Sequence, residues 1–242
     1  MADQLVMEHV VRLFEHAQDP QSTRDRLLAA LDSPESAVMV CGCIQESWQV
    51  FVGKKQGTVT NLGIVAALIL SFAVGMVLGP PEPVADADDM WSGFRDFLLE
   101  AYTVLAAFAA FSALVCVIIS ITWVNNTNDY VHNVDDLLWY MATFSPRMVE
   151  VPLIAGCIAM FAALVLAMPV ISSGVVATLN FFVGVLLGLV TLCYILRAVV
   201  LVDLGRAREA KKASPLYKDA VNKAFSEFER RQAAGNDIRK TS

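Results

Sequence analysis

The chain has 242 residues, of which 56% are hydrophobic and 17% are charged, and its net charge is −6. Soluble domains are typically about 45–50% apolar and about 25% charged, so this composition favours a membrane protein. The acidic balance argues against nucleic acid as a partner, because nucleic-acid binding depends on cationic neutralisation of phosphates.

The first 57 residues predict a cytosolic region of amphipathic helices. Residues 1–33 have the spacing of two short helices, and Pro34 follows as a helix-start signal. Apolar residues then recur on one helical face: Ala37, Cys41, Ile44, Trp48 and Phe51. We interpret this face as a helix lying on the membrane surface, just before Lys54 and Lys55. In the alternative, residues 1–52 form a small helical cap that packs against the C-terminal tail.

Residues 62–79, LGIVAALILSFAVGMVLG, predict the first transmembrane helix. These eighteen residues carry no charge and are just long enough to cross the hydrocarbon core of a bilayer. Small residues recur at every fourth position of this span: Gly63, Ala67, Ser71, Gly75 and Gly79. Because residues four apart share a helix face, we expect this stripe to let the backbone of another helix approach closely.

Three further apolar stretches predict spans over residues 101–124, 152–171 and 175–196. The last two of these spans repeat small residues at four-residue spacing: Ala155, Ala159, Ala163, Ala167, Gly184 and Gly188. The short turn at residues 172–174 predicts that they form an antiparallel hairpin. The expected fold is therefore all-α: a polytopic membrane protein with four transmembrane helices in a close-packed bundle over residues 58–204, and amphipathic cytosolic helices at both ends.

Residues 205–242 predict a cytosolic helical tail. We expect the fourth helix to continue past the membrane, and a separate helix to begin at Ser214-Pro215 and to end at Gly235-Asn236. One face of this second helix is apolar, as in a coiled coil or a docking helix: Tyr217, Val221, Phe225 and Phe228. Such a face needs a partner, which we expect to be residues 1–52 or another subunit.

The basic residues near the spans indicate the orientation of the chain. Nearly all of them fall on one side: Lys54, Lys55, Arg147, Arg197, Arg206, Arg208, Lys211 and Lys212. Only Arg95 falls on the other side, so the positive-inside rule predicts that both termini and residues 125–151 are cytosolic. Spans of about 18–22 residues give a slight preference for an endomembrane over a thicker plasma membrane.

The loop on the outer side is a candidate site for attracting cations. Its carboxylates are Glu82, Asp86, Asp88 and Asp89. Hard cations prefer clustered carboxylates, but the glycine and the closing glutamate of a calcium-binding loop are missing here. A solvated acidic loop is therefore the favoured interpretation.

Two cytosolic motifs carry further hypotheses. Cys41 and Cys43 lie close to the membrane and are candidate acylation sites, unless they belong to a packed face. His132, Asp135 and Asp136 have the i, i+3, i+4 spacing that could bring three ligands to one metal ion. Because a second histidine is missing, a capping cluster at the start of a helix is favoured. We predict no metal site and no cofactor.

The predicted spans contain few side chains that could take part in a chemical reaction. No charged residue occurs within residues 62–79, 101–124 or 152–171, whereas proton-coupled transporters and intramembrane proteases need buried acids, bases or nucleophiles. We therefore expect a non-enzymatic subunit of a membrane complex, oligomeric or accessory, whose partners are the lipid bilayer and either other copies of itself or other membrane proteins. The alternative is a cation channel or transport subunit with a pore between subunits and the acidic loop at its outer mouth.

The layout of the chain is similar to that of Orai-type calcium channels. The shared features are four spans with cytosolic ends, a short hairpin between the last two spans and a helical extension of the last one. That family has an acidic residue in its pore-lining first span, whereas residues 62–79 have none. No residue roles are therefore transferred from it.

Overall fold

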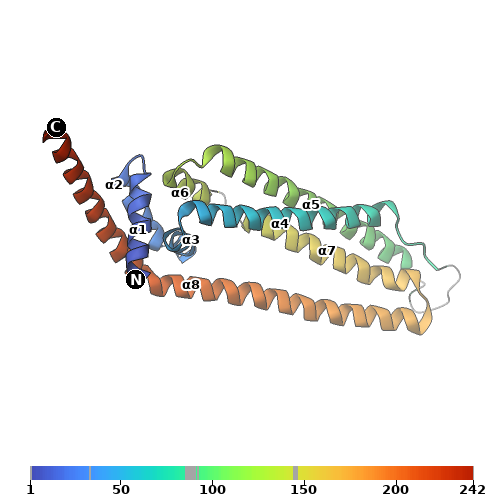
Figure 1. Cartoon of the computed structure of the whole chain (residues 1–242). Helices are drawn as coiled ribbons and strands as arrows, with labels where there is room; N and C mark the ends of the chain where they lie inside the picture. Colours follow the sequence, from blue (N-terminus) through green and yellow to red (C-terminus); the bar gives the residue numbers. More distant parts are fainter. Residues whose placement is uncertain (1, 33, 85–90, 92, 144–146, 242) are drawn as a thin grey trace. The chain divides into compact units, whose positions relative to one another are not determined.

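The computed structural model describes the backbone of residues 2–32, 34–84, 91, 93–143 and 147–241 (Figure 1). In this part of the chain the regular structure is entirely helical. The helices are α1 (Ala2–Glu15), α2 (Pro20–Asp32), α3 (Pro34–Gln45), α4 (Trp48–Leu78), α5 (Arg95–Tyr130), α6 (Val134–Thr143), α7 (Arg147–Ile171) and α8 (Gly174–Thr241).

The chain folds as two compact units that are built from interleaved segments. The cap unit comprises Met1–Gly57, Asn125–Ser145 and Val200–Ser242, and the membrane unit comprises Thr58–Val124 and Pro146–Val199. Helices α4, α5 and α8 each contribute residues to both units. The N-terminal region and the C-terminal tail therefore belong to the same unit.

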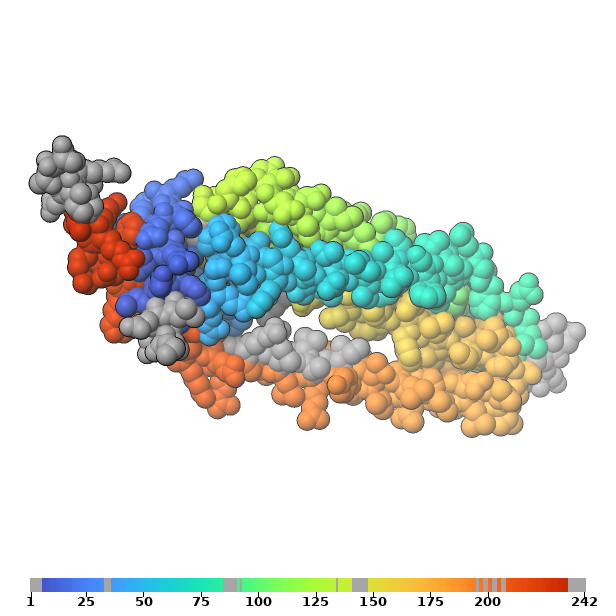
Figure 2. All heavy atoms as spheres, viewed as in Figure 1, coloured from blue at the N-terminus to red at the C-terminus, as the bar shows by residue number. Residues whose placement is uncertain are grey.

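An apolar core holds the cap unit together. Its most deeply buried side chains come from α1, α2, α3 and the last part of α8: Val10, Phe14, Leu27, Ile44 and Val221. The ring of Phe14 meets that of Phe225 edge-on, with centroids 5.2 Å apart. In Figures 1 and 2 the blue N-terminal helices accordingly lie against the red part of α8.

The position of α3 distinguishes between the two arrangements expected for residues 37–52. Ala37 and Ile44 are buried in the core of the cap unit, and α3 ends before Trp48, which begins α4 and packs against the same core. The apolar face that we interpreted as lying on the membrane surface is thus covered by other helices. The helical cap that packs against the C-terminal tail is the arrangement observed.

The tail differs from its prediction because α8 is one continuous helix. Neither the start expected at Ser214-Pro215 nor the stop expected at residues 235–236 interrupts it. A proline inside a helix removes one backbone hydrogen bond and typically costs about 3 kcal/mol. Contacts of the residues before and after Pro215 offset this cost. Ser214 donates its hydroxyl to the carbonyl of Leu31 at 2.8 Å, and Tyr217 is buried in the cap core.

Four segments are long and apolar enough to cross a membrane: Trp48–Leu78, Arg95–Tyr130, Met148–Ile171 and Gly174–Tyr194. This confirms the all-α fold with four transmembrane helices, and the protein is an integral membrane protein. Helix α7 contains Pro152 and Pro169 and continues to the turn before α8. The second proline therefore does not end the helix.

Small residues form the contact among α4, α5 and α7. One buried cluster takes a residue from each helix: Ala73, Ala109 and Ala159. A second cluster joins Tyr102 of α5 to Ala163 of α7, and the tyrosine hydroxyl donates to the carbonyl of Met76 in α4 at 3.1 Å. Buried residues of α5 recur three and four apart: Tyr102, Ala106, Ala109, Ala113, Cys116, Ser120 and Trp123. This seven-residue repeat is typical of coiled-coil-like packing in membranes.

Helix α8 is the outer member of the membrane unit. Only 6% of its apolar segment is buried, against 17–39% for the other three spans, so most of its side chains face the surroundings of the chain. Its contacts within the unit include Val165 and Phe161 of α7, which lie against two of its glycines.

Replacement of Phe14 by alanine tests the core of the cap unit. We expect a loss of about 3–5 kcal/mol in the free energy of unfolding, the usual effect of emptying a buried aromatic site. Because whole domains are stable by only about 5–15 kcal/mol, the cap unit should open measurably. Hydrogen–deuterium exchange of residues 6–45 in the full chain, in nanodiscs, measures this opening. Leu216→Ala is the control, since Leu216 belongs to the same unit, on α8, and is 63% exposed.

Candidate functional site

The small-residue stripe of the first span divides between two faces of α4. A Cβ atom at Gly63 would lie 3.0 Å from the Cβ of Ser120, so the absence of a side chain lets α4 and α5 approach there. The other members of the stripe are exposed: Ala67, Ser71, Gly75 and Gly79. Apart from the local backbone of α4, no atom of the described residues lies within 4 Å of a Cβ placed at Gly75.

Helix geometry explains why the stripe divides. Each residue advances by about 100° around the helix, so a step of four residues rotates the stripe by about 40°, and four steps rotate it by about 160°. The face of α4 that packs inside the chain follows a seven-residue spacing instead: Val59, Ala66 and Ala73. Such a spacing drifts by only about 20° per repeat. The stripe therefore leaves the packed face after Gly63.

The small residues of the last two spans lie against neighbours within the chain. On α7 they are buried or half-buried: Ala155, Ala159, Ala163 and Ala167. On α8, a Cβ at Gly184 would lie 3.2 Å from the side chain of Val165. A Cβ at Gly188 would lie 2.3 Å from the ring of Phe161. These two glycines thus receive large side chains of α7.

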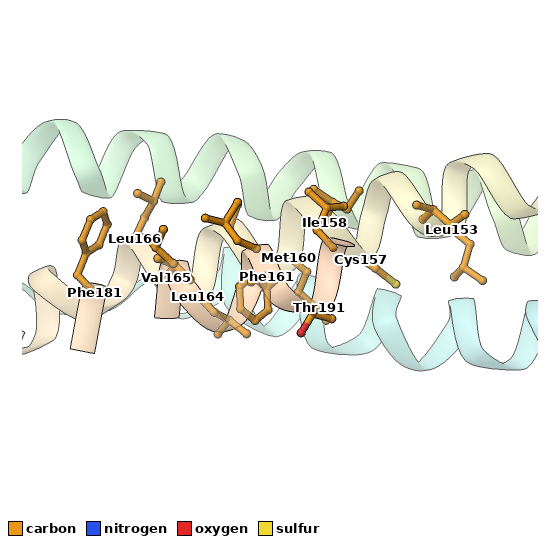
Figure 3. Close-up of a pocket in the computed structure, with 16 residues that line it drawn as sticks. Leu153, Cys157, Ile158, Met160, Phe161, Leu164, Val165, Leu166, Phe181 and Thr191 are labelled. Carbon is orange, nitrogen blue, oxygen red and sulfur yellow. The ribbon is translucent and has the colours of Figure 1, made fainter. Parts of the chain in front are cut away.

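A cavity of about 660 Å³, which we call the α7–α8 groove, lies between these two helices (Figure 3). Its walls are formed by residues 153–166 of α7 and residues 181–192 of α8. Among the described residues that line it, only Thr191 and Cys157 carry a polar group on the side chain. The groove is therefore an apolar site within the transmembrane segments.

The acidic loop between α4 and α5 is attached to α7 and α8 at both of its flanks. The amide of Val84 donates to the carbonyl of Val170 at 3.1 Å. On the other flank, the indole N–H of Trp91 donates to the hydroxyl of Thr178 at 3.1 Å. The Trp91 ring also packs against Phe181, which lines one end of the groove, with centroids 5.1 Å apart.

Arg95 is a buried cation on the same side of the membrane unit. It is 6% exposed and donates its Nε–H to the carbonyl of Pro169 at 3.3 Å, near the C-terminus of α7. A positive charge is favourable there because carbonyl oxygens accumulate at a helix C-terminus. Sequence reasoning used Arg95 only for orientation and missed this structural role.

The described part of the acidic loop contains one of the four residues expected to attract cations. Glu82 is exposed, whereas Asp86, Asp88 and Asp89 lie outside the described residues. Cation attraction by this loop stays a prediction.

The motif around His132 acts as a helix cap and a tether in the cap unit. The side-chain oxygen of Asn133 accepts the amide of Asp136 at 2.8 Å, and Asp136 accepts the amide of His132 at 3.3 Å. Asp135 accepts the hydroxyl of Thr23 at 2.6 Å. Within the described residues, no three His, Cys, Asp or Glu side chains are grouped to hold a metal ion. The favoured interpretation of this motif, a capping cluster, is what the contacts support.

The two candidate acylation sites are buried in α3. Burial raises the pKa of Cys41 to about 11 and that of Cys43 to about 12, although the charge of Lys55 opposes the shift at Cys43. Because the thiolate is the reactive form of cysteine, the folded cap unit disfavours acylation at both positions. Acylation stays a prediction, and it requires α3 to leave the core.

Comparisons of the chain with protein families, with known proteins and with solved structures found no match. The functional interpretation therefore depends on two features of the membrane unit, the exposed small-residue face of α4 and the α7–α8 groove. Both are suited to close packing and to apolar contact rather than to proton or group transfer.

Thiol labelling tests the environment of Cys41 and Cys43. At pH 8 we expect both to react at least about 100-fold more slowly than an exposed cysteine, because two pKa units lower the thiolate fraction about 100-fold. Maleimide labelling followed by peptide mapping measures each site separately. The exposed reference is the variant Gln49→Cys, because Gln49 is exposed in the same unit. If Cys43 reacted as fast as this reference, the core of the cap unit would be open.

Proposed function

We propose that this chain is a non-enzymatic subunit of a membrane complex, which acts by packing its membrane unit against a second copy of itself or another membrane protein. The observation that carries the proposal is the exposed face of α4 formed by Ala67, Ser71 and Gly75. In a bilayer, helices associate through close van der Waals contact between small residues, because lipid tails are as apolar as the helices themselves.

The rest of the membrane unit makes this face unusual. Other small residues of the spans, such as Ala73, Ala109 and Ala163, are fully buried within the chain. On α4, the glycine at position 75 leaves open space beside the backbone that none of the described residues fills. A neighbouring helix could approach this backbone closely, which supports a role in assembly.

The distribution of charge supports a non-enzymatic role. Residues 62–79, 101–124 and 152–171 contain no charged side chain, so these spans supply no acid, base or ion pair for chemistry in the bilayer. The alternative function, a cation channel or transport subunit, depends on the acidic loop. No observation on the described residues favours it.

The proposal includes an orientation with both termini in the cytosol. The basic residues near the spans support it. A second argument comes from the cap unit, because its three segments are the ones that the sequence predicts on the cytosolic side, and they fold together as one compact body. Segments on opposite sides of a membrane could not do so.

Two glycine variants separate assembly from folding. Gly63→Leu must displace Ser120 of α5, so we expect it to lower the free energy of unfolding by about 1–3 kcal/mol, the usual cost of overpacking. At position 75 a Cβ atom has open space among the described residues, so for Gly75→Leu we expect unchanged thermal stability but a smaller native mass in nanodiscs.

Val65→Leu is the matched control, because Val65 is 46% exposed on α4 outside the stripe and its replacement should change neither quantity. A native mass that stays at the wild-type oligomer in Gly75→Leu would contradict the proposal. A wild-type chain that is monomeric in nanodiscs would also contradict it, unless that chain binds another membrane protein and Gly75→Leu abolishes this binding.

A further inference from the structure

We propose that the α7–α8 groove binds one acyl chain of a bilayer phospholipid. This inference is independent of the packing face on α4, because it concerns a different pair of helices. It rests on the size, the lining and the accessibility of the groove.

The dimensions of the groove suit a linear chain. Its volume of about 660 Å³ lies within the roughly 300–1,000 Å³ that is usual for small-molecule sites. The wall on α7 runs over residues 153–166, which corresponds to about 20 Å along a helix that rises 1.5 Å per residue. This length slightly exceeds half of a hydrocarbon core about 30 Å thick, which is the depth that one acyl chain occupies.

The lining of the groove selects an apolar occupant. Its walls are aliphatic and aromatic side chains, and Thr191 and Cys157 supply the polar groups of the described lining. Water is disfavoured, because a buried water molecule needs two to four polar partners. Figure 3 shows the aliphatic and aromatic side chains of α7 along the length of the groove, with Leu153 towards one end and Phe181 of α8 at the other.

The groove is continuous with the lipid-facing surface of the membrane unit. Several of its lining residues are also exposed, among them Ile158 by 43%, Leu164 by 43% and Leu189 by 55%. An acyl chain can therefore enter sideways from the bilayer, while the headgroup stays outside this apolar cavity. At this depth, lipid tails are the molecules that surround the protein.

A single acyl chain is much narrower than a transmembrane helix, which is about 10–12 Å across with its side chains. The occupant of the groove has to lie between α7 and α8, whose side chains line it on both sides. We therefore assign the groove to lipid rather than to a second copy of the chain.

An acyl chain in the groove would also complete the packing of α8. Gly184 and Gly188 hold α8 against Val165 and Phe161, but only 6% of the apolar segment of α8 is buried. A chain lying between α7 and α8 adds van der Waals contacts to both helices along the groove. It fills space that the side chains leave open.

A pair of valine variants on α8 tests the site. Val185 lines the groove, whereas Val183 is 53% exposed and does not line it. Val185→Phe therefore places a ring in the path of an acyl chain, and Val183→Phe adds the same group outside the groove. Each full-length protein is reconstituted in nanodiscs of palmitoyl-oleoyl phosphatidylcholine, transferred to mild detergent and weighed by native mass spectrometry. We expect wild type and Val183→Phe to retain one phospholipid per chain, and Val185→Phe to retain none.

A second variant and two contrary outcomes complete the test. If thermal melting shows that Val185→Phe is misfolded, Ala162→Leu is used instead. Ala162 lines the groove on α7, so the larger side chain enters the groove from that helix. Equal phospholipid retention by filled and unfilled variants would overturn the proposal, because the lipid would then be bound on the outer surface only. A wild-type protein that retains detergent or no lipid at all would also overturn it.

Discussion

The close approach of α7 to α5 at Gly156 is the contact on which the membrane unit depends. A Cβ atom there would lie 3.3 Å from the Cβ of Ser112 and 3.4 Å from the backbone oxygen of Ala109, so α7 rests almost directly on the backbone of α5. In a bilayer no hydrophobic effect drives helices together, and association depends on contact area between closely spaced backbones. The alanine cluster that brings in α4 is possible only because α5 and α7 are already this close.

The two units reach stability by different physical means. In the cap unit, large side chains such as Phe14 and Leu27 are removed from water, and the hydrophobic effect rewards the area that they bury. In the membrane unit alanine is the most frequent of the buried residues described, and most of the large apolar side chains are exposed. This inversion is expected when the surroundings are lipid, because a large apolar residue loses nothing by staying exposed there. The helices that enter both units, such as α5, change from one kind of packing to the other along their length.

The all-α fold and the four transmembrane helices could be predicted from sequence, because a run such as residues 62–79 needs no knowledge of its neighbours to be recognised. The packed faces were harder to predict. The four-residue stripe on α4 predicts a single packed face, whereas it rotates away from the packed side after Gly63. The residues of α4 that do pack follow a seven-residue repeat instead. The break expected at Pro215 was wrong because the local signal was outweighed by burial of Tyr217. In the sequence, only Gly184 and Gly188 indicate that another helix lies close to α8. The α7–α8 groove itself could not be predicted, because a cavity depends on the shapes of two helices together.

Helix α7 presents two different surfaces, and this difference determines how firmly each neighbour is held. Towards α4 and α5 it presents small residues such as Ala159 and Gly156, and the contact is made by the chain alone. Towards α8 it presents Phe161 and Val165, which reach the backbone at two glycines and leave a groove beside them. Large side chains against glycine fix the spacing of two helices at a few points, but they do not fill the volume between those points. The packing of α8 is therefore completed by whatever fills the groove, and the stability of this helix in the membrane unit is expected to vary with the lipid around it.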